Sequence, residues 1–462
     1  MRRTLAAFAF LTLAVACSSK SESAPPDPWS GPLALAKAQD LSPDPHIVEV
    51  NLDATYAEWT LTPGQTVHAM TYNGTVPGPL IEAHVGDTLV VHFVNHLTEP
   101  TTIHWHGVRV PANMDGSPMA QSPVPPGGSF DYQFKLTDAG TFWYHPHADE
   151  PVQMEHGMYG AIVVRGDNEP ALDAEGVVML DDLTLGTDGQ IAAPAGAIEE
   201  HTGREGPVSL LNGRTDLTLP IRAGQRQRWR IVNAGSARFY RLAIPGHTFT
   251  VLGTDGGFVA QPYEATELFL VPGDRLDVVV TGSASASTAT TLQNLPYDRG
   301  HGGGSATTMD LAKVVYDSGS MAGAALPAAF SAIDPIATAG ATTRAITFDE
   351  VIDPDTGDTT FTINGKAYPD VPPFDAHVGK TEVWEIQNKS GMDHPFHLHG
   401  FAFQVIGQSG APLSWEDTIQ LKAKSTLKIA FTPDDRQGMW MYHCHILEHV
   451  KSGMMADFRL TK

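Results

Sequence analysis

Residues 73–79 read Asn-Gly-Thr-Val-Pro-Gly-Pro, and residues 85–95 then read Val-Gly-Asp-Thr-Leu-Val-Val-His-Phe-Val-Asn. Asn-Gly favours a tight turn between two strands. Apolar residues at every second position are typical of a strand with one buried face. This stretch therefore predicts β-structure that begins at a turn and ends at an asparagine.

The same pattern returns twice. Asn212-Gly-Arg precedes an alternating run at 223–233, and Asn364-Gly-Lys precedes another at 378–388. A period of about 140–150 residues is far longer than a solenoid repeat and matches a whole domain. Short strands with Gly- and Pro-rich turns fill all three units, which is typical of Greek-key sandwiches. We predict an all-β chain of three consecutive β-sandwich domains, at 46–168, 175–317 and 340–462.

The N-terminus has the pattern of an export signal. Met1-Arg-Arg is followed by an apolar run that ends at Ala16 and is too short to span a bilayer, so residues 1–17 predict a signal peptide. Cys17 after Leu-Ala-Val-Ala resembles a bacterial lipoprotein box, with plain secretion as the alternative. Residues 18–45, rich in Ser, Pro and Ala, predict a flexible tether. We expect an exported, periplasmic protein held to the membrane by a lipid on Cys17.

The net charge and the cysteine content limit the range of possible functions. The formal net charge of −23 argues against a nucleic-acid partner and favours cations or neutral molecules. The chain has two cysteines, Cys17 and Cys444, so a lipidated mature protein would keep a single thiol. A lone thiol in an exported protein needs an explanation, and metal ligation supplies one.

Ten of the twenty histidines fall in four clusters, two in the first unit and two at equivalent places in the third. They are His104, His106, His145, His147, His394, His397, His399, His443, His445 and His449. The second unit has Tyr240 and Leu242 where the others have histidines. The outer units are therefore predicted to carry metal, and the middle unit to carry none.

Cys444 lies between two of these histidines. Side chains alternate between the faces of a strand, so an extended segment would direct Cys444 to one side and His443 and His445 to the other. Two histidines and a cysteine with a weak axial methionine form a blue-copper electron-transfer site. His394, Cys444, His449 and Met454 fit this set, with Met455 as a rival to Met454. Zinc is a poor alternative because it has no redox chemistry.

Across nearly all of the mature chain, these motifs resemble the three-domain multicopper oxidases, the family of laccases, bilirubin oxidases and cuprous oxidases. The resemblance implies cupredoxin-like domains and four copper ions. It implies a type 1 copper at His394, Cys444, His449 and Met454, and a type 2 copper at His104 and His397. It also implies two type 3 coppers, at His106, His145 and His445 and at His147, His399 and His443.

The implied reaction couples one-electron oxidation of a small reductant to the reduction of dioxygen to water. Phenols or aromatic amines are the first choice of reductant, and Cu(I) or Fe(II) is the alternative. A copper-storage lipoprotein without catalysis is the rival from another class. We expect a monomer.

Reduction of dioxygen to water consumes protons, so carboxylates are expected near the cluster. Asp115 matches a family position near the type 2 site and is nominated as a proton relay, with a turn before Gly116 as the alternative. Val450 occupies the place of an acidic residue that many bacterial relatives carry after the second type 1 histidine. Glu150 is either its substitute or a solvated surface charge, and Glu448 is assigned a structural role.

Overall fold

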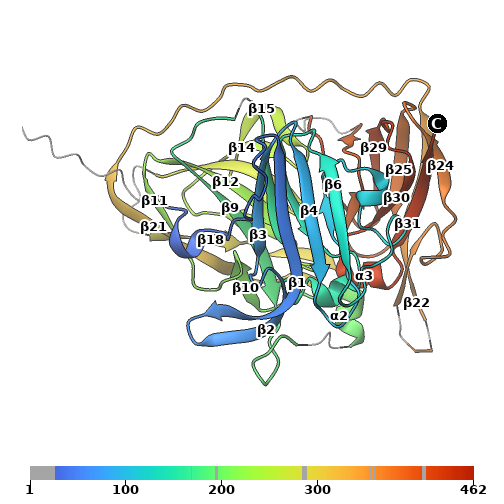
Figure 1. Ribbon diagram of the computed structural model, residues 1–462, viewed down its shortest axis with the longest axis horizontal. Coiled ribbons are helices and arrows are strands. Elements are labelled where there is room, and N and C mark those ends of the chain that lie inside the picture. The colour runs from blue at the N-terminus through green and yellow to red at the C-terminus, as the bar shows by residue number, and fades with distance from the viewer. Residues whose placement is uncertain are drawn as a thin grey trace, which may run out of the picture.

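The computed structural model describes residues 27–167, 169–192, 196–283, 289–353, 355–356, 359–407 and 413–462. The predicted signal peptide and Cys17 lie outside these ranges. Strands form nearly all of the regular structure (Figure 1). Within the described ranges, no helix has the length and apolar character needed to cross a bilayer.

The first domain is a sandwich of two four-stranded sheets. One sheet has the order β2 (Gln65–Tyr72), β1 (Ile47–Thr62), β4 (Thr88–Asn95), β6 (Ser129–Lys135). The other has the order β3 (Gly78–His84), β8 (Gly160–Arg165), β7 (Gly140–His145), β5 (His104–His106). Val91 and Phe93 from the first sheet pack with Trp105 and Tyr144 from the second in one buried cluster. This is the alternation that the sequence at 85–95 predicts.

The second domain has a six-stranded and a five-stranded sheet. The larger has the order β10 (Val208–Leu211), β9 (Ala174–Leu183), β12 (Arg226–Asn233), β17 (Arg275–Thr281), β14 (Phe249–Thr254), β15 (Gly257–Ala265). The smaller has the order β11 (Thr218–Ala223), β21 (Met309–Ser320), β18 (Ala289–Asn294), β13 (Tyr240–Ala243), β16 (Leu268–Leu270). β19 (Tyr297–Gly300) and β20 (Gly303–Ser305) form a separate hairpin. Tyr240 and Leu242 are fully buried in this domain's apolar core.

The third domain has two five-stranded sheets. One has the order β23 (Thr359–Ile363), β22 (Thr342–Ile352), β25 (Glu382–Asn388), β29 (Thr426–Phe431), β27 (Gln404–Val405). The other has the order β24 (Phe374–His377), β31 (Met455–Thr461), β30 (Gly438–Cys444), β26 (His394–Leu398), β28 (Thr418–Leu421). The all-β fold of three cupredoxin-like domains is thereby confirmed.

Each domain has two equivalent asparagines, one in a turn and one at the end of a strand. Asn73, Asn212 and Asn364 all have positive φ values, 55°, 49° and 53°, as the predicted turns require. The asparagines that end β4, β12 and β25 are fully buried. Each donates from its side-chain amide to one backbone carbonyl of the next loop and to a second carbonyl further along the chain, and accepts an N–H from two residues ahead. In the outer domains these fixed loops lead directly into the histidine strands.

The described part of the predicted tether is not a free linker. Trp29 is 6 % exposed and meets Trp229 of the second domain edge-on, with ring centroids 5.9 Å apart. Leu33, in the 3₁₀ turn η1 (Gly31–Leu33), joins the same apolar core. From residue 27 to 45 the prediction of a flexible tether is therefore corrected, because two large apolar side chains anchor the segment.

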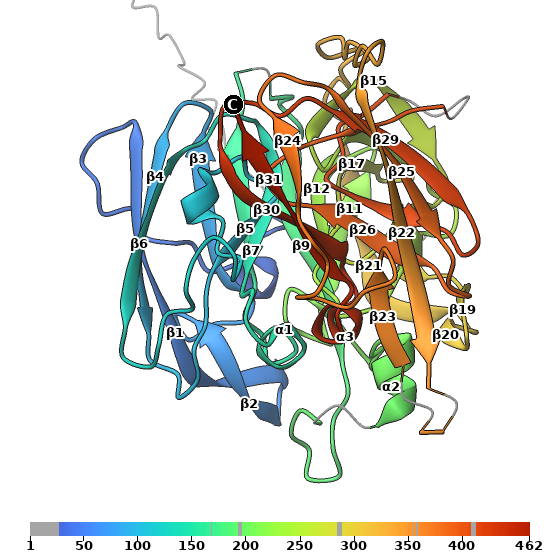
Figure 2. The same cartoon turned by 90° about the vertical axis from the view of Figure 1, so that its right-hand side faces the viewer.

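The first and third domains lie side by side, with the second domain behind them in the view of Figure 2. Strands β5 and β7 of the first domain face β26 and β30 of the third across this contact (Figure 2). Two short helices, α1 (Glu150–Gln153) and α3 (Leu447–Lys451), lie at its lower end, and α2 (Ala197–Thr202) lies on the other side of α3, below the third domain (Figure 2). The predicted histidine clusters all border this interface.

Candidate metal centre

Strand register brings the four histidine motifs together in pairs. His104 on β5 is opposite His145 on β7, and His397 on β26 is opposite His443 on β30. All ten clustered histidines are at most 3 % exposed. Removing ten imidazoles from water costs free energy, so their ring nitrogens need partners inside the protein.

Cys444 lies in a three-atom set inside the third domain. Its Sγ atom is 3.5 Å from Nδ1 of His394 and 3.5 Å from Nδ1 of His449, and the two nitrogens are 3.2 Å apart. A point equidistant from the three atoms lies about 2 Å from each. That is close to the length of a bond from a metal to an imidazole nitrogen or a thiolate sulfur. The set has the trigonal shape of a blue-copper site.

Met454 is fully buried beside this set. Its carbonyl accepts a hydrogen bond from the Cys444 N–H at 3.1 Å, and its own N–H donates to the His449 carbonyl at 2.9 Å. These bonds fold the chain back over Cys444 after α3. Met455, by contrast, is only partly buried and pairs with His443 on the neighbouring strand.

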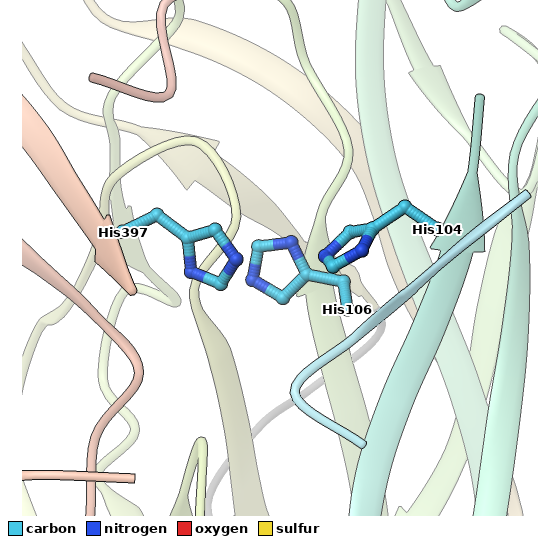
Figure 3. Close-up of side chains that lie close together, drawn as sticks. All are labelled: His104, His106 and His397. Carbon is cyan, nitrogen blue, oxygen red and sulfur yellow. The ribbon is translucent and has the colours of Figure 1, made fainter. Parts of the chain in front are cut away.

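The other eight histidines form one cluster between the first and third domains. Three groups within it have ring nitrogens that all lie within 4.8 Å of one another: His104, His106 and His397; His106, His145 and His445; and His147, His399 and His443. Figure 3 shows the first group, in which His397 reaches across the interface from the third domain toward His104 and His106. The rings of His106 and His397 stack with centroids 3.8 Å apart. Every group thus contains residues of both outer domains.

Hydrogen bonds fix which ring nitrogen is free in His104 and His397. Nδ1 of His104 donates to the Asp115 carbonyl at 2.8 Å, and Nδ1 of His397 donates to the Asp417 carbonyl at 3.0 Å. The Nε2 atoms of these two rings are left buried without a partner, as are both ring nitrogens of His445. Buried acceptors without donors are rare in folded proteins. A metal ion satisfies them, so the residues present fit a bound metal.

Burial keeps most of these groups in the form that a metal needs. It lowers the pKa of His394 to about 3 and lowers the pKa of seven others, so these imidazoles are neutral at pH 7. His147 differs: burial acts to lower its pKa, but Glu150 and Asp115 together with a backbone hydrogen bond outweigh burial and raise it. Burial raises the pKa of the Cys444 thiol far above its ordinary value. This thiol therefore loses its proton when a metal replaces it.

The two nominated carboxylates both reach the cluster. Asp115 is 1 % exposed, and its Oδ2 accepts a hydrogen bond from Nδ1 of His399 at 2.9 Å. Gly116 makes this placement possible, because its φ is +77° and a Cβ there would lie 1.9 Å from the Ile103 carbonyl. Oε1 of Glu150 lies 2.6 Å from Nδ1 of His147, and Glu150 is 8 % exposed. Glu150 is therefore buried and does not match the alternative of a solvated surface charge.

A buried ionic group, which the sequence did not reveal, holds two of the cluster histidines. Asp417 accepts from Nε2 of His106 at 3.1 Å and lies 3.5 Å from Nδ1 of His397. Arg275 of the middle domain donates to both Asp417 oxygens, at 2.6 and 2.5 Å. Asp255 accepts the backbone N–H groups of Asp417 and Thr418. Burial opposes ionisation of Asp417, but Arg275 holds the pKa of this carboxyl well below its usual range.

Two further partners of the three-atom set were also missed. Nε2 of His394 is 2.7 Å from Oγ of Ser390, and Nε2 of His449 donates to the His201 carbonyl at 2.9 Å. These bonds turn the Nδ1 atoms of both rings toward Cys444. The middle domain has no predicted metal, yet it orients residues of both centres through His201 and Arg275.

Comparison with known proteins identifies the family of this chain. Residues 53–169, 141–294 and 343–462 each match a family model described as multicopper oxidase. The chain is 32% identical over 446 residues to the multicopper oxidase MmcO of Mycobacterium tuberculosis, covering 86% of this chain and 85% of that one. It is 28% identical over 487 residues to a laccase of Cryptococcus neoformans, covering 83% and 76%.

Similar solved structures support the same family assignment. The chain superposes on a Campylobacter jejuni multicopper oxidase, described as a metallo-oxidase, with a TM-score of 0.83 and 31% identity, covering 93% of this chain and 94% of that one. It also superposes on the McoA multicopper oxidase of Aquifex aeolicus, with a TM-score of 0.78 and 29% identity, covering 93% and 100%. The chain belongs to the multicopper oxidase family and is a copper-dependent oxidoreductase that uses dioxygen.

Proposed function

We propose that this oxidase draws single electrons from a phenol or aromatic amine at a type 1 copper and reduces dioxygen to water at a cluster of three further coppers. One observation carries the proposal. Cys444 belongs to the three-atom set, while its chain neighbours His443 and His445 belong to two different groups of the eight-histidine cluster. Two peptide units thus join the site that accepts electrons to the site that uses them.

The ligand assignment follows the groups found in the fold. We assign the type 1 copper to His394, Cys444, His449 and Met454, and the type 2 copper to His104 and His397. We assign the type 3 coppers to His106, His145 and His445 and to His147, His399 and His443. Copper supplies the one-electron steps and the activation of dioxygen. The protein supplies fixed tautomers, burial of the ligands and protons.

Asp115 is suited to deliver those protons. Its carboxylate contacts His399, and its backbone carbonyl holds His104, so it lies between two of the proposed copper positions. Oε1 of Glu150 lies 2.6 Å from Nδ1 of His147, which belongs to the same group as His399. With Val450 in place of an acidic residue, these two carboxylates are the proposed carriers of protons to the cluster.

Asp115→Asn is expected to lower turnover about 100-fold or more, as removal of a general acid does. The amide keeps an oxygen for His399 but cannot carry a proton. Stopped-flow and oxygen-electrode assays would measure it, with the type 1 absorption as a check that the fold is intact. Asp149→Asn is the matched control, since that carboxylate is exposed and pairs with Lys451. Unchanged turnover and an unchanged pH profile would rule out the relay.

A metal ion is the second candidate reductant. The acidic net charge favours it, and the Campylobacter jejuni relative is described as a metallo-oxidase. Oxygen consumption by the copper-loaded protein, measured side by side with a phenol, Cu(I) and Fe(II), would rank the reductants. No consumption with any of them would favour copper storage and contradict the proposed function.

For localisation we propose export to the periplasm, a lipid anchor on Cys17 and a monomeric state. The basic start and apolar run before Cys17 support the first two. Incorporation of labelled palmitate by the full chain, lost in Cys17→Ser, would test the anchor. A protein recovered unlabelled in the soluble periplasmic fraction would favour plain secretion.

A further inference from the structure

Asp457 is a buried carboxylate that the proposed reaction has not used. It lies on β31 of the third domain and is 5 % exposed. Its Oδ1 atom is buried and accepts no hydrogen bond from the described residues. A buried polar atom without a partner costs free energy, and such atoms are rare in folded proteins. The place of this carboxylate in the fold indicates a use for it.

Strand register turns Asp457 toward the first domain. Its chain neighbours on β31, Ala456 and Phe458, belong to the apolar core of the third domain. Side chains alternate along a strand, so Asp457 points to the opposite face of the sheet. Met455 points to that face as well, and it lies opposite His443 of β30. Asp457 therefore shares a face with His443, which belongs to the eight-histidine cluster.

Asp115 lies across the interface from this face. It directly follows the 3₁₀ turn η2 (Ala112–Met114), which packs on the start of β30. A Cβ on Gly438 of β30 would lie 2.4 Å from the Cβ of Ala112. Asp457 is close enough for the charge of Asp115 to act on it. In Figure 2, β31 and β30 lie on the side of the third domain that faces the first.

Each of the two carboxylates has one buried oxygen left for a further partner. Oδ2 of Asp115 accepts from His399, while its Oδ1 has no hydrogen-bond partner among the described residues. Oδ1 of Asp457 is in the same condition. Water satisfies buried polar groups of this kind, and a proton can pass between two groups through one water. The two carboxylates are thus placed to exchange protons.

The outer neighbour of Asp457 is the loop at 366–370. Tyr368 in this loop is partly buried, and burial together with the charge of Asp457 raises its pKa to about 12. The Tyr368 N–H donates to the Gly453 carbonyl at 2.9 Å, which holds the loop beside the start of β31. Lys366 and Pro369 of the same loop are exposed. Asp457 therefore lies between the solvent side of this loop and the interior side that holds Asp115.

The surroundings of Asp457 suit the uptake and release of a proton. Burial raises its pKa to about 6, while His147 acts to lower it and Asp115 acts to raise it. Tyr368 and Tyr442 are the other titratable groups that its charge reaches, and their raised pKa values keep both protonated at neutral pH. A carboxyl with a pKa near the working pH can both accept and donate a proton efficiently.

We propose that Asp457 takes protons from solvent and passes them through water to Asp115 for the reduction of dioxygen. The proposal rests on the proposed function of the eight-histidine cluster, and Asp457 acts through Asp115 rather than on dioxygen itself. The Asp457 carboxyl gives its proton inward and regains one from solvent, so neither carboxylate is changed over a cycle. Four protons, four electrons from the reductant and one dioxygen molecule give two water molecules.

Three variants of the copper-loaded protein test this route. Asp457→Asn keeps the shape of the side chain but cannot carry a proton, and Asp457→Glu restores the carboxyl. Asp375→Asn is the matched control: Asp375 lies on the same face of the same sheet, on β24, but it is 56 % exposed and lies 3.7 Å from Arg459. Copper content and the type 1 absorption would show that each variant is folded and loaded.

Three measurements separate proton supply from electron entry. The first is kcat for oxygen uptake with a phenol over a range of pH, in H₂O and in D₂O. The second is the rate at which the phenol reduces the type 1 copper without oxygen. The third is an infrared titration of the protonated carboxyl groups, which needs no turnover.

We expect Asp457→Asn to lower kcat about tenfold, less than the loss of a general acid that acts at the reacting atoms. The solvent isotope effect should rise and the pH profile should change, because proton supply becomes slower. The rate of type 1 reduction should stay at the wild-type value. The infrared titration should lose a carboxyl group whose midpoint lies above the ordinary value of about 4. Asp457→Glu should recover most of kcat, and Asp375→Asn should behave like wild type.

Unchanged kcat, pH profile and isotope effect in Asp457→Asn would overturn the route, as would an infrared titration that this variant leaves unaltered. Slower type 1 reduction or lost copper would also overturn it and would identify Asp457 as a structural residue of β31. Release of hydrogen peroxide instead of water by the wild type would contradict the proposed function. The isotope comparison would still decide the route in that case, because formation of peroxide also consumes protons.

Discussion

Cys444→Ser is expected to abolish both the blue-copper absorption and oxygen consumption. The colour arises from the thiolate of a blue-copper site, and serine cannot supply a thiolate. The same substitution removes the atom that links His394 and His449 to the strand carrying His443 and His445. Serine has nearly the volume of cysteine, so the third domain should still fold, at a cost of about 1–3 kcal/mol for a buried hydroxyl without a partner.

The measurements are the visible spectrum, copper content and oxygen uptake of the purified variant. Met454→Leu is the matched control, because it removes only the proposed axial ligand and keeps the volume. It should retain colour and turnover but shift the reduction potential, since the axial ligand tunes that potential. Met455→Leu should change neither. Turnover that survives in Cys444→Ser would exclude this sulfur as the point where electrons enter.

Asp417→Ala is expected to produce the second large effect, on stability and copper binding together. Arg275 is fully buried and donates to both Asp417 oxygens, so the variant would remove one of its two buried carboxylate partners and leave only Asp255, at 3.3 Å. Loss of one partner of a buried ion pair costs about 3–5 kcal/mol. His106 would also lose the acceptor of its Nε2 proton, and loss of such a partner typically weakens metal binding about 10–100-fold.

Denaturant unfolding and copper retention during dialysis against a chelator would measure the two effects. Asp434→Ala is the control: this carboxylate borders the same 440 Å³ cavity as Asp417, but its side chain is 35 % exposed. Its loss should cost no more than about 1 kcal/mol. If Asp417→Ala unfolded like wild type and kept its copper, the ionic group would have no role in holding the cluster.

The features that could be predicted from sequence are those with a local signature. Asn364-Gly predicts a turn, and the alternating run before Asn388 predicts a strand. Each prediction needs only a few neighbouring residues. The run His443-Cys-His445 also predicts the directions of its own side chains, because alternation along a strand is a local property.

The features that could not be predicted depend on contacts between distant segments. Asp417 reaches His106 only because of the register of β28 beside β26 and the approach of Arg275 from another domain. Nothing near Asp417 in the chain marks it as a partner of histidines. Trp29 was assigned to a tether for the same reason, since its burial depends on Trp229, two hundred positions later. His201 contributes a backbone carbonyl, which no side-chain motif can reveal.

The most direct test is anomalous diffraction at the copper absorption edge from crystals of the copper-loaded protein. We expect one peak within bonding distance of Cys444 Sγ and of Nδ1 of His394 and His449. We expect three more peaks among the eight histidines where the first and third domains meet. Peaks confined to the protein surface, or none within bonding distance of Cys444 and those histidines, would contradict the proposed copper sites.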